Sequence, residues 1–386
     1  MSPNRVAFVT PGSFPLPSPG SSSVERVVEN IVPLLAPHVE PRIYGRTARH
    51  LLRRGTYRGV VCCRYPAANK LNYVRSVGRA LRLFAPQLTV VENRPLYVLR
   101  LRKQRPQARI WLNLHSSTFL SPTRISPASL RESFRQTERI IVNSEYLREV
   151  VASLVPEAAG KLSVVHLGVE SERFLSQYSV QGAQQRDQLR TARGWHGRKV
   201  LLFMGRLIPR KGVHHLLQIL PELAREHPDL LLVVVGSAFY GSHRMTAYTR
   251  QLHRLGNRLP GHVKFVPYVP YSAVPSWFVA ADLAVVPSDS REAFGLVNVE
   301  AMACGLPVVG TRAGGMREVI EDGTTGFLVD PEQPQAGLRE RISWLLHNEE
   351  LRCFMGQRAR ERVEQMFTWE RSADRWLELL RENGYV

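Results

Sequence analysis

The sequence has no uninterrupted apolar run of the length that a membrane span requires, although 44% of its 386 residues are hydrophobic. A transmembrane helix needs about 20 predominantly apolar residues, so we expect no membrane span. The N-terminus, MSPNRVAFVTPG, has too short an apolar run for a secretory signal and is predicted to begin with a strand.

Cysteine is scarce, with only Cys62, Cys63, Cys304 and Cys353. Their spacing is not that of metal ligands, and Cys62 and Cys63 would point to opposite faces of a strand. We interpret all four as reduced core thiols, which is typical of a cytosolic protein. The sequence therefore predicts a cytoplasmic location.

Two ligand-binding motifs are missing as well. No GxGxxG follows the first predicted strand, Arg5–Thr10, which weakens the case for a dinucleotide cofactor. No Asp-x-Asp occurs in the chain, so we expect no metal site that would hold a diphosphate.

Aspartate is absent from residues 1–169, which contain 25 Lys and Arg against 9 Glu, a net charge of +16. Residues 170–386 contain 27 Lys and Arg against 24 Asp and Glu, a net charge of +3. The asymmetry favours two domains with different partners. A basic half attracts anionic lipid, nucleic acid or a phosphorylated substrate, and the alternative is an ordinary solvated surface. No nucleic-acid-binding module is recognisable, so we expect no nucleic-acid partner.

The chain is long enough for two domains, and strand-like runs alternate with helical patterns in both halves. The predicted strands of the first half are Arg5–Thr10, Val60–Arg64, Leu88–Val91, Arg109–Leu114 and Arg139–Asn143. Those of the second half are Val200–Gly205, Leu230–Gly236, His262–Tyr268, Asp282–Pro287, Leu306–Gly310 and Gly326–Pro331. This alternation predicts an α/β fold with a parallel sheet in each half. Residues 170–199 show few strand signals and are predicted to connect the two domains.

The first half offers two candidate ligand positions. The loop Gly12–Ser23 joins a strand to a predicted helix, and Gly20 is where its backbone would approach a phosphate. A simple connecting loop is an equal alternative. His115 ends a predicted strand, at the edge where parallel sheets bind ligands, although a lone histidine is more often structural.

The segment Lys70–Phe84 has the pattern of a basic amphipathic helix. Such a helix suits an anionic membrane surface. An ordinary surface helix packed on its own sheet is the favoured alternative.

The stretch Ser290–Thr311 is the most informative part of the second half. It follows a predicted strand and carries Glu292 in a loop and Glu300 about two turns into a helix. Two carboxylates can accept hydrogen bonds from several hydroxyls, and the helix N-terminus suits a phosphate. The combination suggests a nucleotide sugar.

Further candidates follow three earlier strands of the second half. Arg206 and Lys211 flank a loop beside a helix N-terminus, where a guanidinium and an ammonium make a diphosphate clamp. Solvated surface charge is an equal alternative for this pair. Gly236 ends the buried strand LLLVVVG at the same level, and the exposed end of HVKFVPY, at Tyr268, is placed to contact a base.

The order GRLIPRKG, LLLVVVG, HVKFVPY, DLAVVPS, REAFGLVNVEAMACGLPVVGT, AGGMREVI and GFLVDP resembles the retaining glycosyltransferases of family 4. Glu292 and Glu300 fit the Glu-x7-Glu motif of that family. The segment FVTPGSFPLPSPGSSSVERVVENIVPLL is similar to its spore coat SA subgroup. The resemblance is dense over residues 200–331 and looser over residues 1–169.

The resemblance implies the GT-B fold, in which two doubly wound Rossmann-like domains face each other across a cleft. Residues 1–169 would form the acceptor-side domain, and residues 200–367 the domain that binds the nucleotide sugar. A last helix within residues 368–386 would cross back to the first domain.

The resemblance also implies roles for individual residues. Arg206 and Lys211 would grip the diphosphate, Glu300 would bind the ribose, and Glu292 would bind hydroxyls of the donor sugar. His115 would lie beside that sugar near the reacting carbon.

Two backbone segments have implied roles too. The backbone of Ala293, Phe294, Gly295 and Leu296 would approach the phosphate and the sugar. Gly20 would take the place of an N-terminal glycine loop. Many members have a glycine pair there, whereas this chain has Gly20-Ser21.

The expected function is therefore retaining, metal-independent transfer of a sugar from a nucleoside diphosphate sugar, with a UDP-sugar favoured and no other cofactor. The acceptor would be a glycan, a polymer or a lipid-linked molecule, with an anionic one favoured by the basic first half. Peripheral membrane contact or a spore-coat location would fit. The alternatives are a sugar-nucleotide epimerase or hydrolase, and an inactive spore-coat structural protein.

Overall fold

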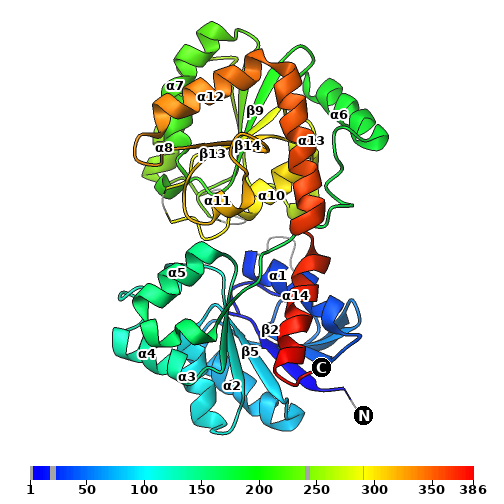
Figure 1. Ribbon diagram of the computed structural model, residues 1–386, viewed down its shortest axis with the longest axis vertical. Coiled ribbons are helices and arrows are strands. Elements are labelled where there is room, and N and C mark those ends of the chain that lie inside the picture. The colour runs from blue at the N-terminus through cyan, green and yellow to red at the C-terminus, as the bar shows by residue number, and fades with distance from the viewer. Residues whose placement is uncertain (1–2, 18–22, 240–243, 290) are drawn as a thin grey trace. The chain divides into compact units, whose positions relative to one another are not determined.

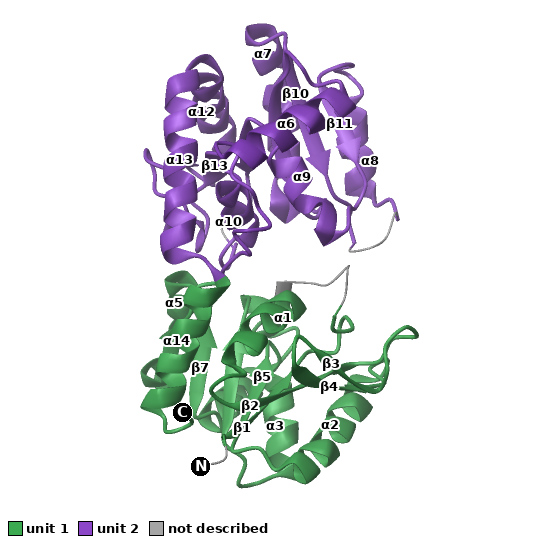
Figure 2. Cartoon of the chain, turned by 90° about the vertical axis from the view of Figure 1, so that its right-hand side faces the viewer, with its two compact units in different colours: residues 1–167, 369–386 green, residues 168–368 purple. Residues whose placement is uncertain are grey.

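The computed structural model describes residues 3–17, 23–239, 244–289 and 291–386 (Figure 1). The chain forms two compact units (Figure 2). Unit 1 consists of Met1–Leu167 together with Trp369–Val386, and unit 2 consists of Gly168–Thr368. No helix within the described ranges is both long and apolar enough to cross a membrane.

Unit 1 is built on a sheet with the strand order β3-β4-β2-β1-β5-β6-β7-β8. All neighbouring pairs are parallel except β3 and β4, which are antiparallel. The strands are β1 (Arg5–Val9), β2 (Glu40–Arg46), β3 (Arg54–Tyr57), β4 (Val60–Tyr65), β5 (Leu88–Glu92), β6 (Ile110–Leu114), β7 (Arg139–Val142) and β8 (Leu162–Val164). The helices are α1 (Ser23–Leu35), α2 (Lys70–Phe84), α3 (Pro95–Gln104), η1 (Ser117–Phe119), α4 (Pro127–Arg135), α5 (Glu145–Leu154), η2 (Pro156–Lys161) and α14 (Trp369–Glu382).

The central strands β1, β5 and β6 of unit 1 are mostly apolar and almost entirely buried, because helices cover both faces of the sheet. Alternate residues of β1 point to opposite faces. Ala7 and Val9 join the core formed with α2 and α3. Phe8 contacts Trp376 of α14, with the ring centroids 6.1 Å apart.

Helix α14 is thus part of unit 1, although it ends the chain. It lies alongside α1 (Figure 1). Trp376 also stacks on Trp111 of β6, with the ring centroids 6.2 Å apart. The hydroxyl of Ser372 donates a hydrogen bond to the carbonyl of His166 at 2.7 Å. The hydroxyl of Tyr385 donates to Glu138 at 2.8 Å. Aromatic packing and these hydrogen bonds fix the end of the chain on unit 1.

Unit 2 is built on a fully parallel sheet with the strand order β11-β10-β9-β12-β13-β14. The strands are β9 (Lys199–Met204), β10 (Leu230–Val235), β11 (Val263–Val266), β12 (Leu283–Val286), β13 (Val308–Thr311) and β14 (Gly326–Val329). The helices are α6 (Val180–Arg193), η3 (Pro209–Lys211), α7 (Val213–Glu226), α8 (Ala247–Gly256), η4 (Tyr271–Ala273), α9 (Val274–Phe278), α10 (Leu296–Ala303), α11 (Met316–Val319), α12 (Pro334–His347) and α13 (Glu349–Met366).

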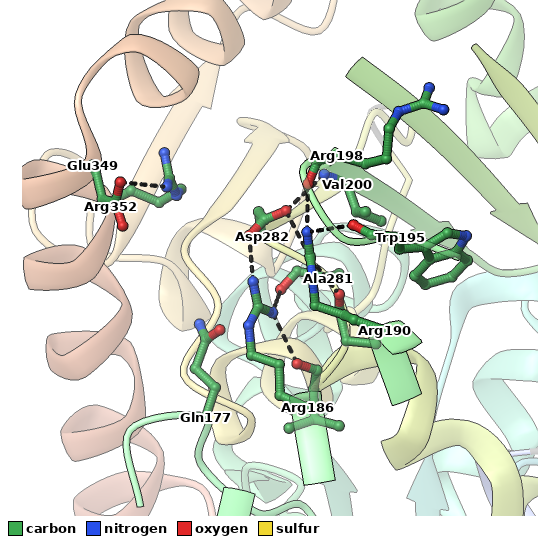
Figure 3. A network of polar contacts seen from close by, with 12 residues as sticks. Gln177, Arg186, Arg190, Trp195, Arg198, Val200, Ala281, Asp282, Glu349 and Arg352 are labelled. Atoms are coloured by element: carbon green, nitrogen blue, oxygen red, sulfur yellow. Dashed lines mark hydrogen bonds and ion pairs between the residues drawn. The ribbon is translucent and has the colours of Figure 1, made fainter. Parts of the chain in front are cut away.

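Residues 170–199 are not a simple connection between domains, and this part of the sequence-based prediction is wrong. They contain α6, which begins at the cap Ser179, ends at Gly194 and belongs to unit 2. Arg186 and Arg190 of this helix both bind the carboxylate of Asp282, as Figure 3 shows. Gly182 is the only buried residue of α6. Arginine contacts rather than an apolar stripe hold the helix, so its hydrophobic pattern is weak.

Candidate active site

The strand order of unit 2 places β9 and β12 side by side, with the later strands on one side and the earlier ones on the other. This is the topological switch point of the sheet, and ligands of such sheets bind there, beyond the carboxyl ends of the strands. Arg206 and Lys211 follow β9, and Glu292 and Glu300 follow β12. The fold therefore collects the four charged candidates of the second half around one switch point.

Lys211 and Glu292, 81 residues apart in sequence, form a direct ion pair. Their side chains are 22% and 19% exposed, so solvent reaches the pair only partly. A second contact links the same two loops, because Arg210 Nε lies 3.2 Å from Asp289 Oδ2. The backbone N–H of Asp289 also donates to the carbonyl of Arg210 at 2.9 Å. The loops after β9 and β12 therefore hold each other in place.

Two glycines, Gly212 after β9 and Gly315 after β13, allow neighbouring loops to approach the loop after β12 closely. Gly212 has a φ of +71°, and a Cβ there would lie 1.8 Å from the carbonyl oxygen of Pro287. A Cβ at Gly315 would lie 2.2 Å from the carbonyl oxygen of Ala293. The N–H of Gly315 donates to the carbonyl of Glu292 at 2.9 Å. Any larger residue at either position would displace the backbone that carries Glu292.

Helix α10 starts from Gly295, which has a φ of +83° and so occupies the left-handed region that glycine favours. Leu296 is its first residue, and Glu300 lies in its second turn and is 5% exposed. Phe294 is buried and packs edge-on against Phe367, with centroids 5.8 Å apart. The aromatic ring thus anchors the loop, and the backbone of Ala293–Leu296 remains the part suited to a ligand.

The other two candidates lie on neighbouring strand ends. Gly236 follows β10, where a Cβ would lie 1.9 Å from the carbonyl oxygen of Gly205. The close approach of two loops is therefore a structural reason for this glycine, independent of any ligand. Tyr268 follows β11, the edge strand, and is half-buried, while Arg206 is exposed.

Two buried polar side chains of this region escaped the sequence-based predictions. Asn298 of α10 is fully buried, and both polar atoms of its amide have no hydrogen-bond partner among the described residues. The same is true of the Ser288 hydroxyl. An asparagine inside the apolar run LVNVEAMA is the sequence signal that would have drawn attention to the first.

Unit 1 has a corresponding switch point between β1 and β5, and His115 lies one strand further, after β6. Its Nε2 lies 2.8 Å from Oε2 of Glu92, and the two side chains are 3% and 2% exposed. Glu92 is the last residue of β5 and was not predicted as a site residue. A glutamate that ends the apolar strand LTVVE was the available signal.

The backbone of His115 is fixed by two asparagines. Its N–H donates to Asn93 Oδ1 at 3.2 Å, and its carbonyl accepts from Asn143 Nδ2 at 3.2 Å. Asn93 has a φ of +51°, so the chain turns sharply after β5. Nε2 of His115 faces Oε2 of Glu92, and Nδ1 has no hydrogen-bond partner within the described part of the chain. The arrangement orients an imidazole whose second nitrogen is available for a hydrogen bond.

Gly20 lies outside the described residues, so its predicted phosphate contact stays a prediction. In the described part of the chain, no three His, Cys, Asp or Glu side chains are grouped as a metal site would require. The four cysteines are free thiols.

Comparison with known proteins gives consistent matches. Residues 185–362 match the family described as Glycosyl transferases group 1. The chain is 31% identical over 379 residues to spore coat protein SA of Bacillus subtilis, covering 98% of this chain and 100% of that protein. It is 30% identical over 266 residues to a GDP-mannose-dependent phosphatidylinositol monomannoside mannosyltransferase of Mycolicibacterium smegmatis, covering 66% and 65% of the two chains.

The solved structure of Anabaena HepE in complex with UDP has a similar fold. Its TM-score is 0.80 at 22% identity, and the match covers 98% of this chain and 100% of that one. These matches confirm the fold and the family that the sequence motifs suggest. The chain belongs to the group 1 glycosyltransferase family and has the GT-B fold.

Proposed function

We propose that the chain is a retaining glycosyltransferase that uses a UDP-sugar and needs no metal ion. The observation that carries this proposal is the contact between Lys211 and Glu292 at the switch point of unit 2, where Arg206 also follows β9 and Glu300 lies in α10 after β12. One place thus combines cations for a diphosphate with carboxylates for sugar hydroxyls. The preference for uridine is supported by the similar folds solved with UDP and with UDP-glucose.

In the proposed reaction, the bond between the sugar C1 and the leaving diphosphate oxygen breaks. The acceptor hydroxyl forms a new bond to C1 on the same face, and its proton passes to the leaving phosphate. Negative charge develops on the diphosphate, and preorganised cations aimed at it stabilise the transition state. Arg206 and Lys211 would supply that charge in place of a metal ion.

The ion pair of Lys211 with Glu292 gives the donor a defined mode of entry. A diphosphate would share the ammonium of Lys211, and Glu292 would then accept hydrogen bonds from the sugar hydroxyls. Glu300, almost fully buried in α10, would bind the ribose hydroxyls. His115, oriented by Glu92, would contact the transferred sugar through Nδ1.

A thermal-shift screen against UDP-, GDP-, ADP- and dTDP-sugars tests the donor. A ligand present at about 100 times its Kd stabilises the folded chain by about 2.7 kcal/mol. We expect UDP-sugars to raise the Tm most. A larger shift with a GDP-sugar, the donor type named for the mycobacterial relative, would refute the uridine preference. NMR analysis of the product should show the anomeric configuration of the donor.

A structural role without catalysis is the second candidate, because one relative that matches 98% of this chain is named a spore coat protein. It predicts that no nucleotide sugar binds and that no product forms with any acceptor. An epimerase or hydrolase is distinguished by a product that forms without acceptor. For the enzyme we propose a cytoplasmic location, which its four free thiols support.

A further inference from the structure

The carboxyl edge of the sheet in unit 1 carries three cations that have no role in the reaction described above. Arg46 ends β2, Lys70 begins α2, and Arg94 lies two residues after β5. We name them the Arg46–Lys70–Arg94 cluster. All three converge on the loop after β1, around Gly12 and Ser13.

The hydrogen bonds donated by this cluster are accepted by uncharged groups, namely backbone carbonyls and a serine hydroxyl. Lys70 donates to the carbonyl of Gly12, and Arg46 donates to the carbonyl of Ser13 at 2.7 Å. Arg94 donates to the hydroxyl of Ser13 at 3.3 Å and to a backbone carbonyl at 2.7 Å. No carboxylate among the described residues lies within salt-bridge distance of any of the three cations.

The positive charges of the cluster act on one another. Partial burial, followed by the charges of Arg46 and Arg94, lowers the pKa of the Lys70 ammonium. Glu25 acts on Lys70 in the opposite direction, but it is fully buried and accepts a hydrogen bond from Phe14 N–H at 3.2 Å. Three cations beside one acid leave an excess of positive charge, and a bound anion would remove their mutual repulsion.

The loop beneath the cluster is held rigidly. The buried hydroxyl of Tyr73 lies 3.1 Å from the carbonyl of Thr10, and the hydroxyl of Tyr97 donates to the carbonyl of Pro11 at 3.1 Å. The guanidinium of Arg94 lies 3.4 Å from the ring centroid of Phe119. Cations fixed in this way lose little freedom when they bind an anion.

The position of the cluster is that of a ligand site. Strands β1 and β5 are neighbours at the switch point of the sheet, and the cluster gathers around the loops that follow them. It also adjoins the site described above, because Arg94 follows Asn93, which holds the backbone of His115.

We propose that the Arg46–Lys70–Arg94 cluster binds a phosphate group of the acceptor substrate. This inference rests on the proposed function, since it assigns the acceptor to unit 1. A phosphate monoester offers up to two charges and three oxygens to three cations, whereas a carboxylate offers one charge and two oxygens. The acceptor class is therefore a phosphorylated sugar or polyol.

Calorimetric titration of the full chain with glucose 6-phosphate, glucuronate and glucose tests the proposal. We expect glucose 6-phosphate to bind at least tenfold more tightly than glucose, and glucuronate to lie between them. Lys70→Gln and Arg94→Gln should each weaken glucose 6-phosphate binding by about tenfold. Equal affinity for glucose and glucose 6-phosphate would overturn the site. Equal affinity for glucuronate and glucose 6-phosphate would overturn the assignment of phosphate.

Matched variants show whether Lys70 binds the anion or only stabilises the loop after β1. Arg79→Gln removes an exposed cation from the same helix and should leave glucose 6-phosphate binding unchanged. Lys70→Arg keeps the charge and should retain most of the affinity. If Lys70→Arg loses as much affinity as Lys70→Gln, the lysine supports the loop and the proposal fails.

Two further measurements distinguish a lipid-borne phosphate from a soluble one and test this proposal separately from the proposed donor site. Vesicles of phosphatidylglycerol that bind wild type better than Arg94→Gln would identify a lipid-borne phosphate. Binding of glucose 6-phosphate alone would identify a soluble one. UDP titration of the same samples separates the two proposals: a chain that binds UDP but not glucose 6-phosphate refutes the cluster, and the reverse result refutes the proposed donor site.

Discussion

The cations near the switch points of the two sheets have different partners. In unit 2, Lys211 pairs with Glu292 and Arg210 pairs with Asp289. In unit 1, the Arg46–Lys70–Arg94 cluster is hydrogen-bonded to carbonyls and a hydroxyl. The charge of each unit agrees with this contrast. Unit 1 contains 28 Lys and Arg against 13 Asp and Glu, a net charge of +15, and unit 2 contains 24 against 20, a net charge of +4.

The contrast suggests two ways of receiving an anion. In unit 2, where Lys211 and Arg210 are paired with carboxylates, the incoming diphosphate would have to share Lys211 with Glu292. Donor binding would therefore free Glu292 to accept hydrogen bonds from the sugar. An unbalanced site attracts an anion by its net charge. Four predictions test this comparison, and their expected effects decrease from the first to the last.

Removing a cation from unit 2 should have the largest effect. Arg206→Ala and Lys211→Ala should each lower kcat/KM by about 10²-fold or more, because charge on the leaving group loses its stabilisation. Steady-state kinetics with the identified donor measures this. Arg258→Ala removes an exposed cation from the same unit and serves as the control. Unchanged kinetics in both test variants would refute the clamp.

Removing the charge of Glu292 should separate the two roles of the ion pair. We expect Glu292→Gln to lower kcat/KM by about tenfold, because a charged acceptor for sugar hydroxyls is lost. Affinity for UDP itself should stay equal or rise, since Lys211 is no longer shared. A fall in UDP affinity comparable to that of Lys211→Ala would contradict the division of roles.

Glu92 should act as a positioning residue in unit 1. Glu92→Gln keeps the shape but not the charge, and we expect kcat/KM to fall about fivefold while UDP affinity is unchanged. The effects of Glu92→Gln and His115→Ala should not be additive if both act through the imidazole. Additive losses in the double variant, or a loss of UDP affinity, would assign Glu92 a different role.

Removing divalent ions should have the smallest effect. If Arg206 and Lys211 replace a metal ion, EDTA should leave the rate of transfer unchanged. The measurement is the initial rate with EDTA and after magnesium is added back. A complete loss of activity that magnesium restores would refute the metal-independent mechanism.

The strands of unit 2 show what a local pattern can predict. The predicted strand Leu230–Gly236 is β10 (Leu230–Val235), since six consecutive buried apolar residues identify a strand covered on both faces. β2 was not predicted, because EPRIYGR combines proline, glycine and two arginines. Its Ile43 and Tyr44 are nevertheless buried between β1 and β4. Neighbouring strands, and not its own sequence, make this segment a strand.

In the candidate site, too, some residues were recognisable from the sequence and others were not. The motifs around Glu292, Glu300, Arg206 and Lys211 were recognisable in the sequence because loop and helix signals bracket them. The partner of His115 was not, because Glu92 lies 23 residues earlier and only the pairing of β5 with β6 brings the two together.

The sequence by itself determined the α/β class, the family and the charged residues available for catalysis, because apolar periodicity and short motifs are local properties. Only the tertiary structure decided which charges meet. Lys211 contacts Glu292, Glu92 contacts His115, and three cations from β2, α2 and the segment after β5 gather at one loop. The reason is physical: strand order places distant strand ends together, and that order depends on packing across the whole sheet.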